Sequence, residues 1–349
     1  MWAIGCDYAE VDLDNDPRSD GLGTLLADAR TASQPAVVLH ASTPTQSETV
    51  VAGRVQTDQP TLAQPGHLFR LASVSKTWVA VAVLQQVEAG DMDLDAPIGQ
   101  YLPTDVAGQI ANTQTATVRQ VLGMRSGMAE YLENDFFLAI EANPTRTWTP
   151  RQALQYAQGQ PAAFTPGTRF EYVNTNYLLL HLALEQVTGQ PLHQVLRAQI
   201  LDPVGATATF TQGAESYTGT LVHGYEDWDE NGSVDDTFNV NDGFGIGDGA
   251  LVANAADVAR FYRALFDEKS LLGEAMLAEL LSDPEGDEYG LGIEVTNDGG
   301  VTQWGHSGGV LGFTTDVRYR PANKTLVVLL HADVDLDDAM VAAAFRTLD

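Results

Sequence analysis

Runs of β-branched and aromatic residues near both ends of this chain predict strands. Six are expected, two near the start and four near the end: residues 36–40, 49–55, 290–295, 301–304, 313–320 and 325–331. The last two flank the turn Pro321-Ala322-Asn323-Lys324, which predicts a β-hairpin. We therefore expect one sheet assembled from both ends of the chain.

Helical periodicity and helix-end signals dominate between these strands. Helices are expected over residues 22–30, 78–89, 177–187, 192–200, 255–266 and 337–348, with short helices beginning near 117 and 149. Thr149 is a good N-cap, because Pro150 follows it at the first helical position and Gln152 stands three residues after it. Gly90 and Gly189 are placed to end helices.

This order of elements predicts a mixed α/β and all-α architecture, with an antiparallel sheet flanked by helices and a helical domain inserted into it. We expect an acidic flexible leader over residues 1–20 and an α/β sheet domain made of residues 21–95 and 215–349. A mostly helical inserted domain should occupy residues 96–214. A chain of 349 residues can bury the core that this organisation needs.

The charge balance is strongly acidic. The chain has 47 Asp and Glu against 18 Lys and Arg, which gives a formal net charge of −29. Such a surface repels nucleic acids and anionic membranes, and no run approaches the roughly 18 apolar residues of a membrane helix. A high-salt habitat is one hypothesis, because salt would screen the self-repulsion.

The single cysteine, Cys6, rules out an intrachain disulfide. Its context, Ala3-Ile4-Gly5-Cys6, faintly resembles the end of a lipoprotein signal. The start of the chain is therefore either a trimmed export segment or a plain flexible leader, and a lipid anchor at Cys6 is a further hypothesis. We expect a periplasmic or extracellular location, with a cytoplasmic location as the alternative.

A candidate nucleophile opens the strongly helical run that ends at Gly90. Ser73 and Lys76 are three residues apart, so on a helix their side chains share one face. A serine hydroxyl needs a base beside it, and a lysine can be that base if burial disfavours its charge. The alternative is that Ser73 is an ordinary helix cap.

Two further groups could complete a catalytic site. Tyr172 and Asn174 can present a phenol and a carboxamide together, and a nearby cationic Lys76 would lower the pKa of the phenol. Glycines in the strand from Trp304 to Gly309 allow close approach of a substrate and a backbone oxyanion hole. Both groups could instead be structural.

A glycine-rich stretch, Gly243 to Gly249 with Asp248, precedes the helix at 255–266. Its glycines have the wrong spacing for a phosphate-binding loop, and no clear strand precedes them.

Several short motifs occur along the chain in an order and spacing that are typical of one family. They are Ser73-Val74-Ser75-Lys76, Tyr101-Leu102-Pro103, Thr117-Val118-Arg119, Arg125-Ser126-Gly127, Tyr172-Val173-Asn174, Leu201-Asp202-Pro203, Tyr289-Gly290-Leu291-Gly292 and Gly305-His306-Ser307-Gly308. In order and spacing the chain resembles the penicillin-recognising serine hydrolases, which include class C β-lactamases, class-C-like D-alanyl-D-alanine carboxypeptidases, D-aminopeptidases and family VIII-type carboxylesterases. The resemblance implies a β-lactamase/transpeptidase-like fold without a cofactor.

The resemblance also implies a role for each residue. Ser73 would attack a carbonyl and become acylated, with Lys76 or Tyr172 as the base. Tyr172 would protonate the leaving group and later activate water, and Asn174 would hydrogen-bond the substrate's amide. The strand His306-Ser307-Gly308-Gly309 would take the place of Lys-Thr-Gly and bind substrate. The backbone N–H groups of Ser73 and Gly309 would form the oxyanion hole.

Two departures from the family pattern leave the substrate open. His306 supplies at most a titratable charge. Carboxypeptidases of this type hold a free carboxylate with an arginine after Tyr-Gly-Leu-Gly, whereas this chain has Ile293-Glu294 there, and Gly309 lacks a hydroxyl. A D-alanyl-D-alanine carboxypeptidase or related D-amino-acid peptidase leads. A carboxylesterase or weak class C-like β-lactamase is the alternative, and a non-catalytic binding module of the same fold is the alternative from another class.

One acidic loop resembles the first half of an EF-hand calcium loop. Asp227, Asp229 and Asn231 have the spacing of its first ligands, and Asp235 stands at position 9. Position 12 is Phe238 rather than Glu, and chance clustering is common in so acidic a chain. Calcium is therefore a hypothesis, and otherwise no cofactor is expected.

Overall fold

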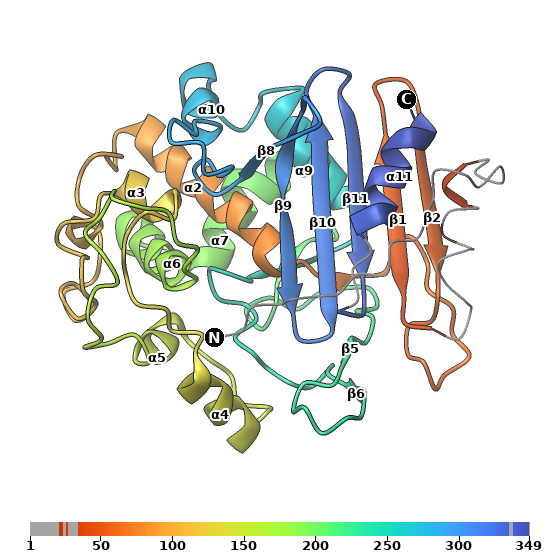
Figure 1. Ribbon diagram of the computed structural model, residues 1–349, viewed down its shortest axis with the longest axis horizontal. Helices are drawn as coiled ribbons and strands as arrows, with labels where there is room; N and C mark the ends of the chain where they lie inside the picture. The colour runs from red at the N-terminus through yellow and green to blue at the C-terminus, as the bar shows by residue number, and fades with distance from the viewer. Residues whose placement is uncertain (1–20, 24–25, 27–33, 335–337, 349) are drawn as a thin grey trace.

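The computed structural model describes residues 21–23, 26, 34–334 and 338–348, and its centre is a six-stranded sheet (Figure 1). The strand order is β2-β1-β11-β10-β9-β8, and the neighbouring strands are antiparallel. The strands are β1 Val37–Ser42, β2 Ser47–Ala52, β8 Glu294–Asp298, β9 Val301–Val310, β10 Phe313–Arg320 and β11 Thr325–His331. Because β1 pairs with β11, the sheet joins the two ends of the chain, as the sequence predicts.

Alternating side chains of the sheet enter two different cores, as the period-2 geometry of strands requires. On one face, Leu39 and Leu329 pack with Phe345 of α11 (Asp338–Leu348). On the other face, Val38 and Val328 join the large core that contains α2 and α9. The sheet is thus buried on both faces, with α11 on one side and α9 on the other (Figure 1).

Outside this sheet the described chain forms helices, joined by long loops and two small sheets. These helices are α2 Ser75–Ala89, α3 Val118–Leu122, α4 Asn134–Ala142, α5 Pro150–Leu154, α6 Thr175–Thr188, α7 Leu192–Leu196, α8 Asp202–Val204, α9 Ala255–Phe266 and α10 Glu274–Leu280. Two small sheets join β3 Phe69–Arg70, β7 Leu251–Ala253 and β4 Phe210–Thr211, and β5 Tyr225–Glu226 with β6 Asp235–Asp236. Thr149 caps α5 through a capping box with Gln152, and Gly189 ends α6 at φ 68, as the sequence predicts.

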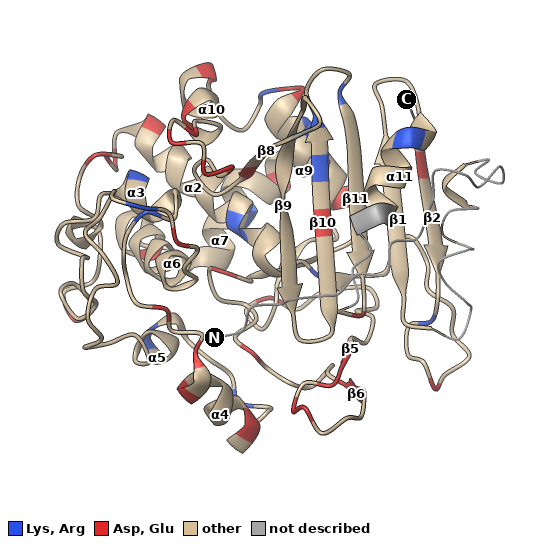
Figure 2. Cartoon of the chain, in the orientation of Figure 1, with Lys and Arg blue, Asp and Glu red and all other residues tan. Residues whose placement is uncertain are grey.

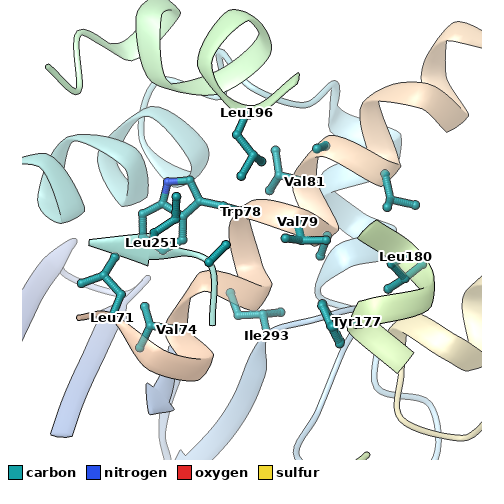
Figure 3. Packing of buried hydrophobic residues seen from close by; sticks show 14 of the residues in the cluster. Leu71, Val74, Trp78, Val79, Val81, Tyr177, Leu180, Leu196, Leu251 and Ile293 are labelled. Atoms are coloured by element: carbon teal, nitrogen blue, oxygen red, sulfur yellow. The ribbon is translucent and has the colours of Figure 1, made fainter. Parts of the chain in front are cut away.

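Helix α2 lies at the centre of the larger core. Every residue from Ser75 to Leu84 is buried, which is the pattern of a helix surrounded by protein on all sides. Trp78 stacks on Phe261 of α9 with ring centroids 3.8 Å apart. Figure 3 shows Trp78, Val79 and Val81 of α2 packed among side chains of other elements. The helix ends at Gly90 in the left-handed conformation, φ 82, which suits a residue without Cβ. The side chains at its start are therefore held on a rigid element.

Some expected boundaries are wrong. Strand β8 begins only at Glu294, because residues 289–293 form a tight turn in which Gly290 N donates to Ile293 O over 2.8 Å. Strand β9 continues to Val310, beyond the expected end at 304, since its glycines hide the strand pattern. The expected helix at 192–200 is split into α7 and a π-helical segment over Arg197–Leu201.

Other expectations are not tested. The leader 1–20, Cys6 and most of the expected helix 22–30 lie outside the described residues. The domain boundaries at 95/96 and 214/215 stay predictions.

Among the described residues no helix is long and apolar enough to cross a membrane. Acidic residues are spread over loops and helices around the molecule, with basic residues sparse between them (Figure 2).

Candidate active site

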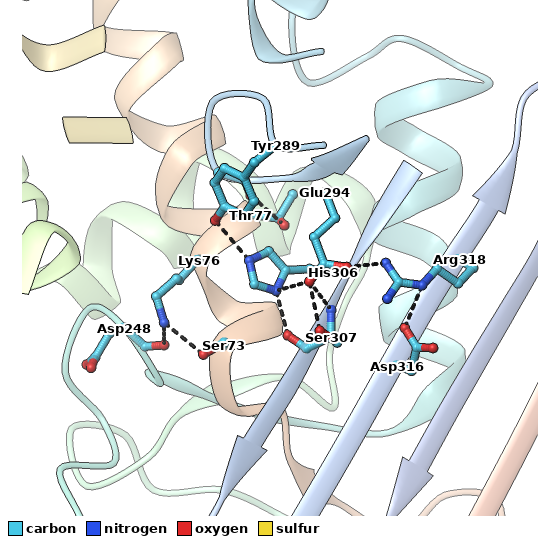
Figure 4. A network of polar contacts seen from close by, with 11 residues as sticks. Ser73, Lys76, Thr77, Asp248, Tyr289, Glu294, His306, Ser307, Asp316 and Arg318 are labelled. Atoms are coloured by element: carbon cyan, nitrogen blue, oxygen red, sulfur yellow. Dashed lines mark hydrogen bonds and ion pairs between the residues drawn. The ribbon is translucent and has the colours of Figure 1, made fainter. Parts of the chain in front are cut away.

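Ser73 lies in a short 3-10 helix, Ala72–Val74, directly before α2. The N-cap of α2 is Val74 and makes no side-chain cap, so the interpretation of Ser73 as an ordinary cap is wrong. Instead, Lys76 Nζ donates a hydrogen bond to Ser73 Oγ over 2.8 Å (Figure 4). The three-residue spacing therefore places the hydroxyl and the amine in direct contact.

Lys76 is fully buried and has two acidic neighbours. Its amine also donates to the backbone oxygen of Asp248 over 3.0 Å, and the Asp248 carboxylate accepts a hydrogen bond from the Tyr131 hydroxyl over 2.7 Å. Burial lowers the pKa of Lys76 to about 8, although the negative charges of Asp248 and Glu130 oppose this shift. A lysine in this state can be neutral in a useful fraction of molecules near pH 7.

Tyr172 contradicts one electrostatic expectation. Its ring centroid lies 5.1 Å from Lys76 Nζ, so the two side chains are close, but the pKa of the phenol is raised well above 10 instead of lowered. Burial of the hydroxyl is the largest cause, and hydrogen bonding with Ser73 offsets only part of it. The residue as a whole is nevertheless 37% exposed, so the burial concerns the hydroxyl group more than the rest of Tyr172. Tyr172 is therefore a protonated phenol at neutral pH.

Asn174 precedes α6 and is held by Glu130. One Glu130 oxygen accepts the backbone N–H of Asn174 over 2.6 Å and its side-chain amide over 3.2 Å. The other accepts the N–H groups of Tyr131 and Leu132 over 2.7 and 2.9 Å. Burial raises the pKa of Glu130. Sequence reasoning missed Glu130, which no local motif distinguishes, and it noted Asp248 only inside a glycine-rich stretch.

Strand β9 passes directly beside Ser73. A Cβ added to Gly308 would lie 2.9 Å from both Ser73 N and Leu71 O, so glycine permits this close approach. A Cβ on Gly309 would meet nothing within 4 Å, so this position is open. The backbone that is expected to bind substrate thus lies against the candidate nucleophile.

His306 is buried on the same strand and is not a cation at neutral pH. Its Nε2 lies 3.0 Å from the Tyr289 hydroxyl and its Nδ1 lies 2.5 Å from Ser307 O. Burial lowers the pKa of His306 to about 4. Its ring centroid lies 6.2 Å from that of Tyr172. His306 therefore supplies a neutral imidazole where class C β-lactamases carry a charged lysine. Tyr289, which stands in one of the recognised motifs, had not been assigned to the site.

The calcium hypothesis gains no support. Asp227 Oδ2 accepts from Gly232 N over 2.9 Å, and Asn231 Oδ1 accepts from Ser233 N over 2.9 Å, so these side chains hydrogen-bond to the loop's own backbone. Among the described residues no group of three or more His, Cys, Asp or Glu could hold a metal ion, and calcium at Asp227, Asp229, Asn231 and Asp235 stays a hypothesis.

Comparison with known proteins gives one family. The beta-lactamase family model matches residues 34–348. PbpX of Bacillus subtilis, which is named as a penicillin-binding protein, is 25% identical over 262 residues, 75% of this chain and 61% of PbpX. Esterase EstB of Burkholderia gladioli is 31% identical over 146 residues, 40% of this chain and 37% of EstB. This chain therefore spans less than two thirds of either relative.

A solved structure covers more of the chain. The D-stereospecific amidohydrolase from a Streptomyces species is 28% identical, has a TM-score of 0.79 and covers 93% of this chain and 96% of its own.

Proposed function

Since this chain belongs to the beta-lactamase family and is a serine hydrolase, we propose that it cleaves amide bonds of D-amino-acid derivatives through an acyl-enzyme on Ser73. The observation that carries this proposal is the hydrogen bond from the buried Lys76 amine to the Ser73 hydroxyl. A nucleophile and a base in hydrogen-bond contact, beside an open strand, form the arrangement that acyl transfer needs.

In the proposed acylation step, Lys76 is the base. Neutral Lys76 takes the proton of Ser73 Oγ while that oxygen attacks the substrate carbonyl. Tyr172 is a poor candidate for this role, because its raised pKa keeps the phenol protonated. A protonated phenol beside Ser73 is instead suited to give its proton to the departing amine.

The tetrahedral intermediate needs donors for its oxyanion. We assign them to the backbone N–H groups of Ser73 and Gly309, since Gly308 brings β9 against Ser73 N. Asn174, oriented by Glu130, would contact the substrate's amide. Tyr172, left as a phenolate once it has protonated the amine, would take a proton from the water that attacks the acyl carbonyl. Lys76 would return its proton to Ser73 Oγ as the acyl group leaves.

The similarity to the D-stereospecific amidohydrolase, at 28% identity over almost the whole chain, supports an amide of a D-amino acid as the substrate. Among the substrates considered from the sequence, this favours a D-amino-acid peptidase over a D-alanyl-D-alanine carboxypeptidase. A carboxylesterase is the second candidate, because EstB is 31% identical over part of the chain. Esters have better leaving groups than amides, so the same site can act on both.

A substrate panel tests the proposal. Wild type and Ser73→Ala are compared on D- and L-alanine p-nitroanilide, a short p-nitrophenyl ester, a D-alanyl-D-alanine peptide and a chromogenic cephalosporin, with intact-mass detection of the acyl-enzyme. We expect turnover of the D-anilide over the L-anilide and an adduct that Ser73→Ala lacks. Ser233→Ala, a change in the β5–β6 loop, is the matched control. Ester-only turnover would replace the proposal by a carboxylesterase, and no adduct with any compound would refute it.

A further inference from the structure

One carboxylate close to the candidate site has an unusual set of partners. Strand β8 pairs with β9 only from Glu294 opposite Gly305 to Asp298 opposite Val301. Residues 306–310 of β9 therefore run beyond β8, and Gly308 in this stretch lies against Ser73. The Glu294 side chain, at the first position of β8, reaches into the edge that β8 leaves open.

Three donors converge on the Glu294 carboxylate (Figure 4). Oε1 accepts the backbone N–H of Ser307 over 3.0 Å and the Ser307 hydroxyl over 2.7 Å, and Oε2 accepts from Arg318 Nη1. The Glu294 side chain is 19% exposed and that of Arg318 is 16% exposed, so water competes little. A strand N–H, a hydroxyl and a guanidinium are the donors that proteins use to bind a carboxylate.

The electrostatics agree with this geometry. Burial alone would raise the pKa of Glu294. The charge of His306, which is protonated only at low pH, the charge of Arg318 and the two hydrogen bonds from Ser307 together lower it to about 2. Glu294 is therefore ionised throughout the working range of most enzymes. The donors form a complete anion site, and the anion in it belongs to the chain.

We propose that Glu294 fills a carboxylate-binding site with its own side chain and thereby makes the enzyme reject substrates that carry a free carboxylate next to the scissile bond. This specificity role rests on the proposed amide hydrolysis at Ser73. A substrate carboxylate that reached Ser307 would find the donors occupied. It would also meet the charge of Glu294 itself.

The charged groups around Glu294 also disfavour the binding of a substrate carboxylate. Asp316 lies 2.9 Å from Arg318 Nε, so one guanidinium serves two carboxylates. His306 does not supply a second positive charge at neutral pH, because its pKa is about 4. The set of Glu294, Asp316 and Arg318 therefore keeps one net negative charge, which favours neutral or cationic groups on a substrate.

Two substitutions separate the effect of filling the anion site from the effect of the negative charge of Glu294. Glu294→Ala removes the carboxylate and frees the Ser307 and Arg318 donors. Glu294→Gln removes only the charge, because its amide oxygen can still accept from Ser307. Glu288→Gln is the matched control, since Glu288 is exposed, lies on the approach to β8 and changes the net charge equally.

The first measurement is a ratio of kcat/KM values for two peptides with the same scissile bond, N-acetyl-D-alanyl-D-alanine and its C-terminal amide. We expect the ratio of acid to amide to rise at least about tenfold in Glu294→Ala, since freed charge-assisted hydrogen bonds contribute one to two powers of ten. The rise should be smaller in Glu294→Gln and absent in Glu288→Gln. An unchanged ratio in Glu294→Ala, or an equal rise in Glu288→Gln, overturns the proposal. If Glu294→Ala does not fold, the ratio in Glu294→Gln is compared with that in Glu288→Gln instead. A rise in Glu294→Gln alone then supports the proposal, and equal ratios overturn it.

The second measurement does not need activity. Acetate should raise the melting temperature of Glu294→Ala relative to chloride at equal ionic strength, and should not do so for wild type. If no peptide is cleaved by wild type while acetate still stabilises Glu294→Ala, the anion site stands and the proposed function fails. If acetate stabilises neither protein, the anion site is refuted, whatever the activity.

Discussion

If Lys76 is the base, the acylation rate must follow the neutral fraction of its amine. A pKa of about 8 instead of 10.5 increases this fraction at pH 7 roughly 300-fold, to about one molecule in ten. The neutral fraction grows as pH rises, so kcat/KM should increase roughly ninetyfold between about pH 6 and about pH 9 and then level off.

Asp248→Asn tests in which direction a nearby negative charge shifts the pKa of Lys76. Asp248 has a pKa raised to about 6 by burial, so it is ionised over most of this range, and its charge favours the Lys76 ammonium. Two charges in one buried pocket attract by a few kcal/mol, and about 1.4 kcal/mol corresponds to one pH unit. Removing the charge should therefore move the midpoint of the profile down by at least about one unit, while the asparagine can still accept the Tyr131 hydrogen bond.

The assay is the pH profile of kcat/KM with N-acetyl-D-alanine p-nitroanilide, which has no titrating amine of its own. Asp135→Asn, an exposed change in the first turn of α4, controls for the overall charge. A midpoint above about pH 10 would make Tyr172 the base, since its pKa lies there. A profile without a rising limb, or an upward shift in Asp248→Asn, would refute the role given to Lys76.

Four further outcomes follow from the structure. Gly308→Ala should reduce kcat/KM at least about a hundredfold, because its Cβ would push β9 away from Ser73, and a melting curve checks that the fold survives. Glu130→Gln should raise KM for amide substrates without lowering kcat, since Asn174 loses a carboxylate acceptor while the neutral fraction of Lys76 increases; steady-state kinetics give the split. Thr117→Ala should lower the free energy of unfolding by about 1 kcal/mol in urea titrations, because it removes a capping box. The melting temperature should rise with sodium chloride, since salt screens a net charge of −29, and indifference to salt would contradict the halophile hypothesis.

Regular patterns made much of the fold predictable. The helix expected at 255–266 and the hairpin strands expected at 313–320 and 325–331 have the observed bounds of α9, β10 and β11. In each case polar or capping residues mark both ends of a periodic run. Strand β9 was underestimated because Gly305, Gly308 and Gly309 remove the apolar alternation at the place where close approach to Ser73 requires glycine.

Some residues of the site can be predicted from a local motif, and others come together only in the folded chain. Ser73 and Lys76 are neighbours on one turn, so their contact could be read from spacing. Glu130 and Asp248 come from loops far away in sequence, and nothing local shows that they surround the same amine. The pKa of Tyr172 was predicted in the wrong direction for the same reason: proximity of a cation is visible in a motif, whereas loss of solvent depends on the packed neighbours.

This dependence on packing explains why the nucleophile stands directly before a deeply buried helix, α2. Two carboxylates close to Lys76 favour its charged form, and a charged lysine cannot accept a proton from Ser73. Burial has to outweigh both of them, and it does: Lys76 is fully buried, with the ring centroids of Tyr172 and Tyr177 5.1 and 5.6 Å from its amine. A cavity in this core should therefore weaken catalysis as well as stability, because water reaching the amine would return its pKa toward 10.5 and lower the neutral fraction.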